Sequence, residues 1–199
     1  MADRAAAPDL TIVVPVKDEA GNIRTLLGEI ARDLAALRFE VVCVDDGSAD
    51  GTAAELRDAM REYPWLRTIR HRRSCGQSTA ILTGVRAARA EWIATIDGDG
   101  QNPPAEIAKL IQARDAAGGA VAMVAGQREK RHDSWFRRLS SRIANGVRQG
   151  LLKDGVSDTG CSLKLFRRED FLALPYFDHM HRFLPALVQR NGGTTLSVE

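Results

Sequence analysis

The sequence predicts an α/β fold with a mostly parallel central sheet and helices on both faces. Segments of strand length alternate with segments of helical periodicity at least four times before Gln127. Most strand-like segments are continuous runs rich in β-branched residues, which is typical of parallel strands buried on both faces. Because no internal repeat or low-complexity linker interrupts the 199 residues, we expect one domain.

The expected strands are short apolar segments bounded by polar or glycine-containing turns. The first of them, "LTIVVPV", has no polar residue except one threonine. The expected strands are residues 10–16, 39–46, 66–71, 92–97, 120–126 and, after the alternation stops, 163–166.

The segments between the strands have helical spacing of their apolar residues. The first such pattern begins at Asn22 and continues to Leu37. Asp50 or Thr52 is a suitable N-cap for the next helix, and Pro103-Pro104 suits the first turn of another. The expected helices are residues 22–37, 50–60, 78–90, 103–116, about 135–153, and a last one that starts near residue 181.

Composition excludes several classes of protein. The formal net charge of +2 gives no global field that would mark a nucleic-acid binder. Cys43, Cys75 and Cys161 are isolated, which indicates reduced thiols in a cytosolic protein and neither a disulfide framework nor a zinc site. No secretory signal and no run of about 18 apolar residues is visible, so we expect a soluble or peripheral chain.

Two of the expected strands end in acidic residues, Asp45-Asp46 and Asp97-Gly98-Asp99. Ligands of open α/β sheets bind at the carboxyl ends of the strands. Four carboxylates at one edge would repel one another unless a cation or many donors lie among them. The alternative is that these residues simply form turns, as Asp and Gly often do.

A hard divalent cation fits the Asp97-x-Asp99 pattern. An EF-hand starting at Asp97 would need glycine and glutamate where Asn102 and Ala108 stand, and no glycine-rich phosphate-binding motif is present. Two carboxylates with a phosphate-bearing ligand are the usual arrangement for Mg²⁺, and Mn²⁺ would accept the same oxygens. Gln101 could add a carbonyl oxygen.

Four blocks carry a resemblance to a known family: "VVPVKDEAGNI", "VVCVDDGSADGT", "GQSTAILTGVRAARAEWIATIDGDGQNPP" and "DTGCSLKLFRRE". Together they resemble family 2 glycosyltransferases with the GT-A fold, and within these the polyprenyl-phosphate, dolichol-phosphate mannose synthase-like branch. The resemblance spans about Leu10 to Gly192. It implies a single GT-A domain over residues 1–199, with a nucleotide-binding half at about 10–127 and an acceptor and sugar half at about 128–199.

The resemblance also implies roles for individual residues. Asp97, Asp99 and Gln101 match the metal and diphosphate site, in a loop where Gly98 and Gly100 replace the usual alanine and leucine and should loosen the backbone. The residues that match the nucleotide pocket are Pro15, Lys17, Glu19, Asp46 and Gly76. The residues that match the donor-sugar side are Asp158 and Lys164. His181 and Arg182 face the sugar or the acceptor, or cap the last helix; these alternatives stay open.

Residues 128–148 contain seven Lys or Arg residues and only two acids, with Trp135 and Phe136 among them. This segment could be a solvated helix face, and a nucleic-acid site lacks a supporting motif. An anionic lipid fits the mixture of cations and aromatic rings better. In the resembled branch Arg128 matches a residue that contacts the diphosphate or the acceptor, and Arg137 or Arg138 matches another.

The sequence therefore predicts a metal-dependent, inverting glycosyltransferase that uses Mg²⁺ or Mn²⁺. The expected donor is a UDP- or GDP-linked sugar, and the expected acceptor is a polyprenyl phosphate at the cytoplasmic face of the membrane. The alternatives are transfer to a glycan or protein hydroxyl, or a nucleotide-sugar-binding module without catalysis. No nucleic-acid partner is expected, and a homo-oligomer is left open. The resemblance also implies a further strand and, in many members, membrane helices after residue 199, so a C-terminal part is expected to be missing.

Overall fold

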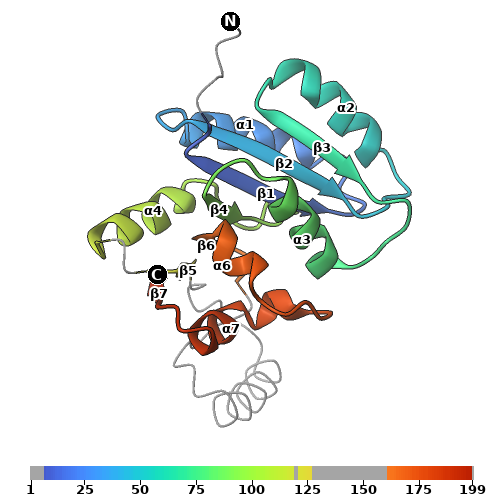
Figure 1. The fold of residues 1–199 in the computed structure, drawn as a ribbon. Helices are drawn as coiled ribbons and strands as arrows, with labels where there is room; N and C mark the ends of the chain where they lie inside the picture. Colours follow the sequence, from blue (N-terminus) through green and yellow to red (C-terminus); the bar gives the residue numbers. More distant parts are fainter. Residues whose placement is uncertain (1–6, 119–120, 127–160, 199) are drawn as a thin grey trace, which may run out of the picture.

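One seven-stranded sheet organises the computed structural model, which describes residues 7–118, 121–126 and 161–198 (Figure 1). The strand order is β3-β2-β1-β4-β6-β5-β7. Every neighbouring pair is parallel except the two pairs that β6 makes with β4 and β5. The strands are β1 Leu10–Val16, β2 Phe39–Asp45, β3 Leu66–Arg70, β4 Trp92–Thr95, β5 Met123–Gly126, β6 Lys164–Arg167 and β7 Thr195–Val198.

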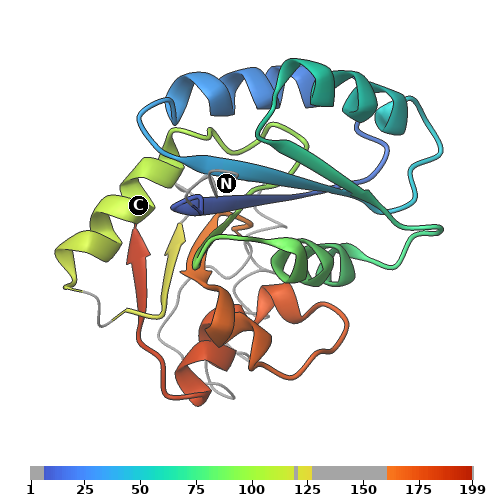
Figure 2. The same ribbon diagram turned by 45° about the horizontal axis from the view of Figure 1, so that its top comes forward.

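Helices cover both faces of the sheet, as the sequence predicts (Figure 2). Alternate residues of β1 point to opposite faces, so that Ile12 and Val14 pack with α1, α2 and α4, whereas Val13 packs with α3, α6 and α7. The helices are α1 Ile23–Asp33, α2 Thr52–Glu62, α3 Gln77–Ala87, α4 Glu106–Ala116, α6 Arg168–Leu172 and α7 Leu184–Arg190, with a 3₁₀ turn η1 at Met180–Arg182.

Several predicted boundaries are wrong by a few residues. α1 ends at Asp33, and Leu37 lies in a turn, where it still packs against the core. The N-cap of α2 is Gly51, although the carboxylate of Asp50 accepts the N–H of Thr52 at 2.9 Å. α3 starts at Gln77 and ends at Ala87, β4 ends at Thr95, and β5 begins at Met123.

The double proline lies before α4 and not in its first turn. α4 begins at Glu106, two residues after Pro104, because the carbonyls of Pro103 and Pro104 accept the N–H groups of Glu106 and Ile107 in a preceding turn.

His181 lies in η1 and not in the following helix, which starts at Leu184. The helix expected at about residues 135–153 lies outside the described residues. Within the described ranges, no helix is both long and apolar enough to cross a bilayer.

Gly84 allows α3 to lie directly on β1. A Cβ atom at this position would overlap Cγ1 of Val13. We expect Gly84→Ala to lower the free energy of unfolding by about 1–3 kcal/mol, because the core must shift to accept the methyl group. Urea unfolding would measure this loss.

Gly28 provides the matched control for Gly84, because it lies inside α1 and a Cβ there would meet only Tyr63 Oη at 3.9 Å. Gly28→Ala should stabilise the protein by about 0.4–1 kcal/mol. Val13→Ala combined with Gly84→Ala should recover part of the loss. A Gly84→Ala protein as stable as the unmodified one would contradict this account of the α3–β1 contact.

Candidate active site

The two acidic strand ends lie on either side of β1. β2 and β4 both pair with β1 in parallel, with Asp45 opposite Val16 and Thr95 opposite Val13. Because parallel strands end at the same edge of the sheet, the segments that follow β1, β2 and β4 meet there. The prediction that both acidic stretches reach one edge is therefore consistent with the topology.

Asp46 holds the loop of residues 71–76, which connects β3 to α3. Asp46 is 4% exposed, and its carboxylate accepts the backbone N–H groups of Cys75 and Gly76 at 2.8 and 2.9 Å, as well as the hydroxyl of Ser74 at 2.8 Å. Nδ1 of His71 lies 2.7 Å from Oδ1 of Asp46. Burial alone would raise the pKa of Asp46, but the hydrogen bonds from this loop outweigh it, and the pKa is lowered.

Asp45 is also compensated by protein groups. Its carboxylate is buried, accepts the N–H of Ser48 at 2.8 Å and lies 3.1 Å from Nε of Arg70. Asp46 and Oδ1 of Asp45 are thus engaged with donors of the chain, whereas the buried Oδ2 of Asp45 has the ion pair with Arg70 but no hydrogen bond within the described part of the chain. The crowding of four carboxylates inferred from the sequence is relieved at β2 by the protein itself.

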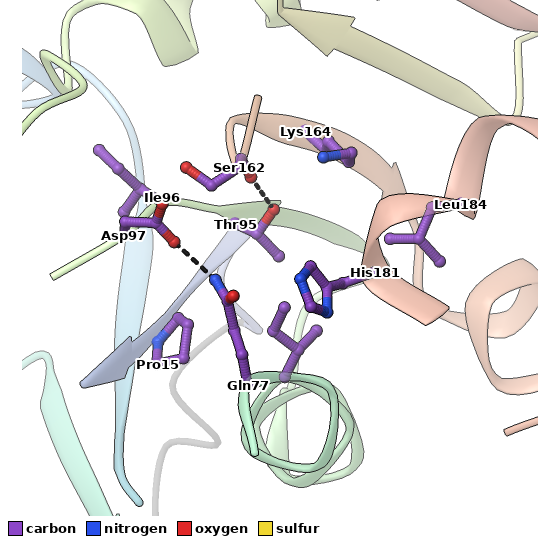
Figure 3. A pocket seen from close by; sticks show the side chains of 10 residues that line it. Pro15, Gln77, Thr95, Ile96, Asp97, Ser162, Lys164, His181 and Leu184 are labelled. Atoms are coloured by element: carbon purple, nitrogen blue, oxygen red, sulfur yellow. Dashed lines mark hydrogen bonds between the residues drawn. The ribbon is translucent and has the colours of Figure 1, made fainter. Parts of the chain in front are cut away.

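The loop after β4 carries Asp97, Asp99 and Gln101. The side-chain amide of Gln77, the first residue of α3, donates to Oδ1 of Asp97 at 2.8 Å (Figure 3). Oδ1 of Asp99 accepts the N–H of Gln101 at 3.0 Å. Two carboxylates in a short loop at a strand end form an oxygen-only donor set, which fits a hard divalent cation such as Mg²⁺ or Mn²⁺.

The two glycines of this loop, which were expected to loosen it, differ in their surroundings. A Cβ atom on Gly98 would lie 2.6 Å from Cγ1 of Val16, so Gly98 lets the loop pack closely against β1. Gly100 has a φ of +69°, and a Cβ atom there would have no neighbour within 4 Å, so this glycine serves the turn and not the packing.

Two polar residues connect β4 and the loop that follows it to Ser162, which precedes β6. Asn102 is 7% exposed, and its side-chain amide donates to Oγ of Ser162 at 2.9 Å. The hydroxyl of Thr95 donates to the carbonyl of Ser162 at 2.6 Å. These bonds connect positions 60 and 67 residues apart in sequence and hold the loop relative to the antiparallel part of the sheet.

A small pocket lies between these elements (Figure 3). It brings together Pro15, Asp97, Lys164 and His181, four residues that the sequence assigned to the site. The other lining residues are Gln77, Ile81, Thr95, Ile96, Ser162 and Leu184. Lys164 is 3% exposed, and its ammonium group donates to the carbonyl of Cys161.

The remaining predicted residues lie in different places. Lys17 is exposed and donates to the hydroxyl of Ser74 at 3.2 Å, which places it beside the 71–76 loop. Glu19 accepts from the side chain of Asn22 at 2.7 Å, at the start of α1. Arg182 is exposed in η1 and does not line the pocket. The predictions for Arg128, Arg137, Arg138 and Asp158 lie outside the described residues.

Sequence reasoning missed His71, Gln77, Ser78 and Asn102. His71 follows β3, so the rule that strand ends meet at one edge could have found it. Gln77 and Ser78 lie in the "GQSTAILTG" block, but their partners are distant in sequence.

The ligand atoms of Asp46, His71 and Cys75 also lie within 4.8 Å of one another. Because Asp46 already accepts bonds from His71 and from the Cys75 backbone, we assign this cluster to the shape of the loop and not to a metal.

The chain matches a known protein family over most of its length. The model of the family "Glycosyl transferase family 2" matches residues 11–174. The chain belongs to this family. The family expected from the sequence is thereby confirmed, and the matched segment contains both acidic strand ends and the 71–76 loop.

Relatives within glycosyl transferase family 2 include two kinds of polyprenyl-phosphate enzyme. The undecaprenyl-phosphate 4-deoxy-4-formamido-L-arabinose transferase of Edwardsiella ictaluri is 33% identical over 202 residues, which cover 100% of this chain and 61% of the relative. The dodecaprenyl-phosphate galacturonate synthase of Rhizobium johnstonii is 33% identical over 190 residues, 94% of this chain and 56% of the relative. The chain spans 54–61% of the length of five of the curated relatives it matches.

Solved structures share the fold. A mannosyltransferase of Pyrobaculum calidifontis in complex with GDP-Man and Mn²⁺ has a TM-score of 0.69 at 22% identity, covering 98% of this chain and 56% of that one. Glucosyl-3-phosphoglycerate synthase of Mycobacterium tuberculosis in complex with Mn²⁺, UDP and glucosyl-3-phosphoglycerate has a TM-score of 0.77 at 16% identity, covering 97% of this chain and 70% of that one. These likenesses confirm the predicted GT-A type of fold.

His181 should make the stability of this family member depend on pH. Burial, followed by the nearby charge of Lys164, lowers the pKa of His181 from 6.5 to about 4. Between pH 4 and 6.5 the unfolded chain binds more protons at this histidine than the folded chain does. His181 therefore does not reduce the free energy of unfolding above about pH 6.5, and this free energy falls as the pH decreases towards 4. Urea unfolding between pH 4 and 8 should show a stability difference between the unmodified protein and His181→Asn that shrinks as pH falls. A difference that stays constant over this range would contradict the prediction.

Proposed function

We propose that this chain is the catalytic domain of a metal-dependent, inverting glycosyltransferase that moves one sugar from a nucleoside diphosphate to a polyprenyl phosphate. The observation that carries the proposal is the position of Asp97 at the carboxyl end of β4, in the pocket that also contains Lys164 and His181. The names of the relatives support the polyprenyl-phosphate acceptor, and the bound ligands of the structural neighbours support a UDP- or GDP-linked donor with Mn²⁺.

Asp97 and Asp99 would hold the cation, with Gln101 as a further oxygen ligand. A divalent cation bound there neutralises charge that gathers on the diphosphate as the bond to the sugar breaks. Gln77 fixes the orientation of Asp97, and the bonds of Asn102 and Thr95 to Ser162 hold the loop. These bonds would orient the ligands of the cation before the donor binds.

Asp46 would order the nucleoside end of the donor pocket through the 71–76 loop. The four groups that contact its carboxylate come from residues 71–76. Lys17 reaches the same loop through Ser74. The nucleoside end and the diphosphate end of the donor would thus meet at the start of α3, where the N-cap Gly76 donates to Asp46 and the first helical residue Gln77 donates to Asp97.

The reaction needs no strong base if the acceptor is a phosphate. The second pKa of a phosphate monoester is about 6, so an oxygen is already ionised at neutral pH. That oxygen attacks the anomeric carbon as the bond from this carbon to the donor diphosphate breaks, with inversion. Arg128 and Arg137 or Arg138 would position the acceptor phosphate, and the enzyme would work as a peripheral protein at the cytoplasmic face of the membrane.

A hydroxyl acceptor is the second candidate, because a neutral imidazole lies in the pocket. A sugar or protein hydroxyl loses a proton as it attacks, and a histidine is the commonest base for this purpose. His181 is the residue that would serve here. The two candidates therefore differ in what His181 does.

Incubation of the full-length protein with labelled UDP- and GDP-sugars, short polyprenyl phosphates, and Mg²⁺ or Mn²⁺ tests the proposal. The expected product is a labelled lipid that extracts into butanol and requires the metal. A labelled product that stays in water and requires a hydroxyl acceptor would favour the second candidate. Tight donor binding in calorimetry with neither transfer nor donor hydrolysis would indicate a binding module.

A further inference from the structure

His181 is held at the pocket by its position in η1. The preceding residue, Met180, is 1% exposed and packs in the core between the sheet and α3, α6 and α7. His179, before it, adopts the left-handed conformation with φ of 61°. These constraints direct the ring of His181 into the pocket that Gln77 and Lys164 also line (Figure 3).

Ser78 fixes which ring nitrogen of His181 carries the proton. Nδ1 lies 2.7 Å from Oγ of Ser78, and the backbone N–H of His181 donates to the same oxygen at 3.4 Å. Ser78 is 1% exposed, so its hydroxyl needs an acceptor inside the protein. Among the described residues Nδ1 of His181 is that acceptor, since the backbone N–H can only donate. The ring proton of the neutral imidazole therefore belongs on Nε2.

The charges around the ring come from several elements. Lys164 belongs to β6, Asp97 follows β4, and Asp178, His179 and Arg182 flank His181 in its own segment. Burial and the positive neighbours keep the imidazole neutral, since they lower its pKa to about 4. A neutral ring with Nδ1 engaged presents Nε2–H as a donor, and in this form Nε2 cannot take a proton from a ligand.

We propose that Nε2–H of His181 donates a hydrogen bond to one hydroxyl oxygen of the transferred sugar, and that Ser78 is the positioning residue that selects this tautomer. This inference rests on the proposed function. In the proposed function the diphosphate lies at Asp97, in the same pocket as His181. The sugar attached to the diphosphate would therefore lie next to the imidazole. The cavity volume is about 10 Å³, which is just enough for one water-sized group such as a hydroxyl.

The tautomer with the proton on Nε2 is compatible with a phosphate acceptor but not with a hydroxyl acceptor that needs His181 as its base. A hydroxyl acceptor needs a base whose lone pair faces the pocket, whereas Nε2 carries a proton there. An ionised phosphate brings no proton that must be removed. His181 would thus contribute to the choice of donor sugar through this hydrogen bond, and it would not serve as the base.

Nitrogen-15 NMR of the imidazole rings at neutral pH tests the tautomer without any turnover. We expect His181 in the unmodified protein to show a protonated Nε2 and an unprotonated Nδ1. Ser78→Ala should mix the two tautomers. Ser162→Ala is the matched control, because it removes a pocket hydroxyl that bonds Asn102 and not His181, and it should leave the His181 signals unchanged. A proton on Nδ1 in the unmodified protein would overturn the assignment, whatever the enzyme's reaction is.

A set of donors, each lacking one sugar hydroxyl, tests the contact. In the unmodified full-length enzyme one position should lower kcat/KM by about 10- to 100-fold, the cost of an unpaired buried donor. His181→Gln keeps an N–H group near the place of Nε2 and should retain part of this discrimination. His181→Asn keeps a polar group only near Nδ1 and should lose it. Equal discrimination in the Asn variant and the unmodified enzyme would overturn the contact, whereas absence of transfer from every donor by the unmodified enzyme would overturn the proposed function and leave the NMR result standing.

Discussion

Asp99→Ala is expected to lower the rate of sugar transfer at least about 100-fold, which is the effect of losing one preorganised group that stabilises charge in a transition state. Asp99 supplies one of the two carboxylates in the loop after β4. Without it the cation would be held by Asp97 and the weaker oxygen of Gln101. The developing charge on the diphosphate would then be poorly neutralised. Initial rates at saturating donor and a series of Mn²⁺ concentrations would measure the loss.

Asp99→Asn separates the metal role from the shape of the loop. The asparagine oxygen can still accept the N–H of Gln101, which Asp99 accepts at 3.0 Å, but the negative charge is gone. We expect this variant to be nearly as inactive as Asp99→Ala, with Mn²⁺ binding weakened in calorimetry and thermal stability close to that of the unmodified protein. An Asn variant that turns over at the unmodified rate would remove the metal claim.

Gly47→Ala is expected to have the largest effect on stability, about 2–3 kcal/mol. The position has a φ of +74°, and a Cβ atom there would lie 2.7 Å from the backbone carbon of Arg73 and the backbone nitrogen of Ser74. Left-handed strain and contact with rigid backbone both add to the cost. The 71–76 loop would have to move away from Asp46. The variant should therefore bind nucleotide more weakly even where it remains folded.

Gly192→Ala is the control for the strain at Gly47. Gly192 has a similar φ of +87° at the end of α7, but a Cβ atom there would have no neighbour within 4 Å. Its loss in urea unfolding, about 1 kcal/mol, measures the left-handed conformation alone. The additional loss of stability in Gly47→Ala then measures the close approach of Gly47 to the backbone of Arg73 and Ser74. Equal losses at the two positions would show that this approach is not required.

The fold was predictable from the sequence where the pattern is local. β1 has the predicted bounds because "LTIVVPV" is apolar throughout apart from one threonine and ends in a polar turn. β7 was missed, since "TLSV" is short and half polar, and it becomes a strand through its pairing with β5. α6 was missed for a similar reason: "REDFL" has one buried side chain, Phe171, which stacks on Phe166 at 5.0 Å. Such elements depend on contacts that no local pattern contains.

The sequence alone determined the family and the mostly parallel character of the sheet, and it is the source of the prediction that "IDGDGQ" supplies oxygen ligands. These features lie within short segments, where spacing and residue type carry the chemistry. The tertiary structure decided which carboxylates the protein itself compensates, because the donors to Asp46 come from a loop that starts 25 residues later. It also brought the hydroxyl of Ser78 to Nδ1 of His181, which lies 103 residues away in sequence. Hydrogen bonds over such separations follow from the packing of α3 and η1 on one sheet, and packing is a property of the whole chain.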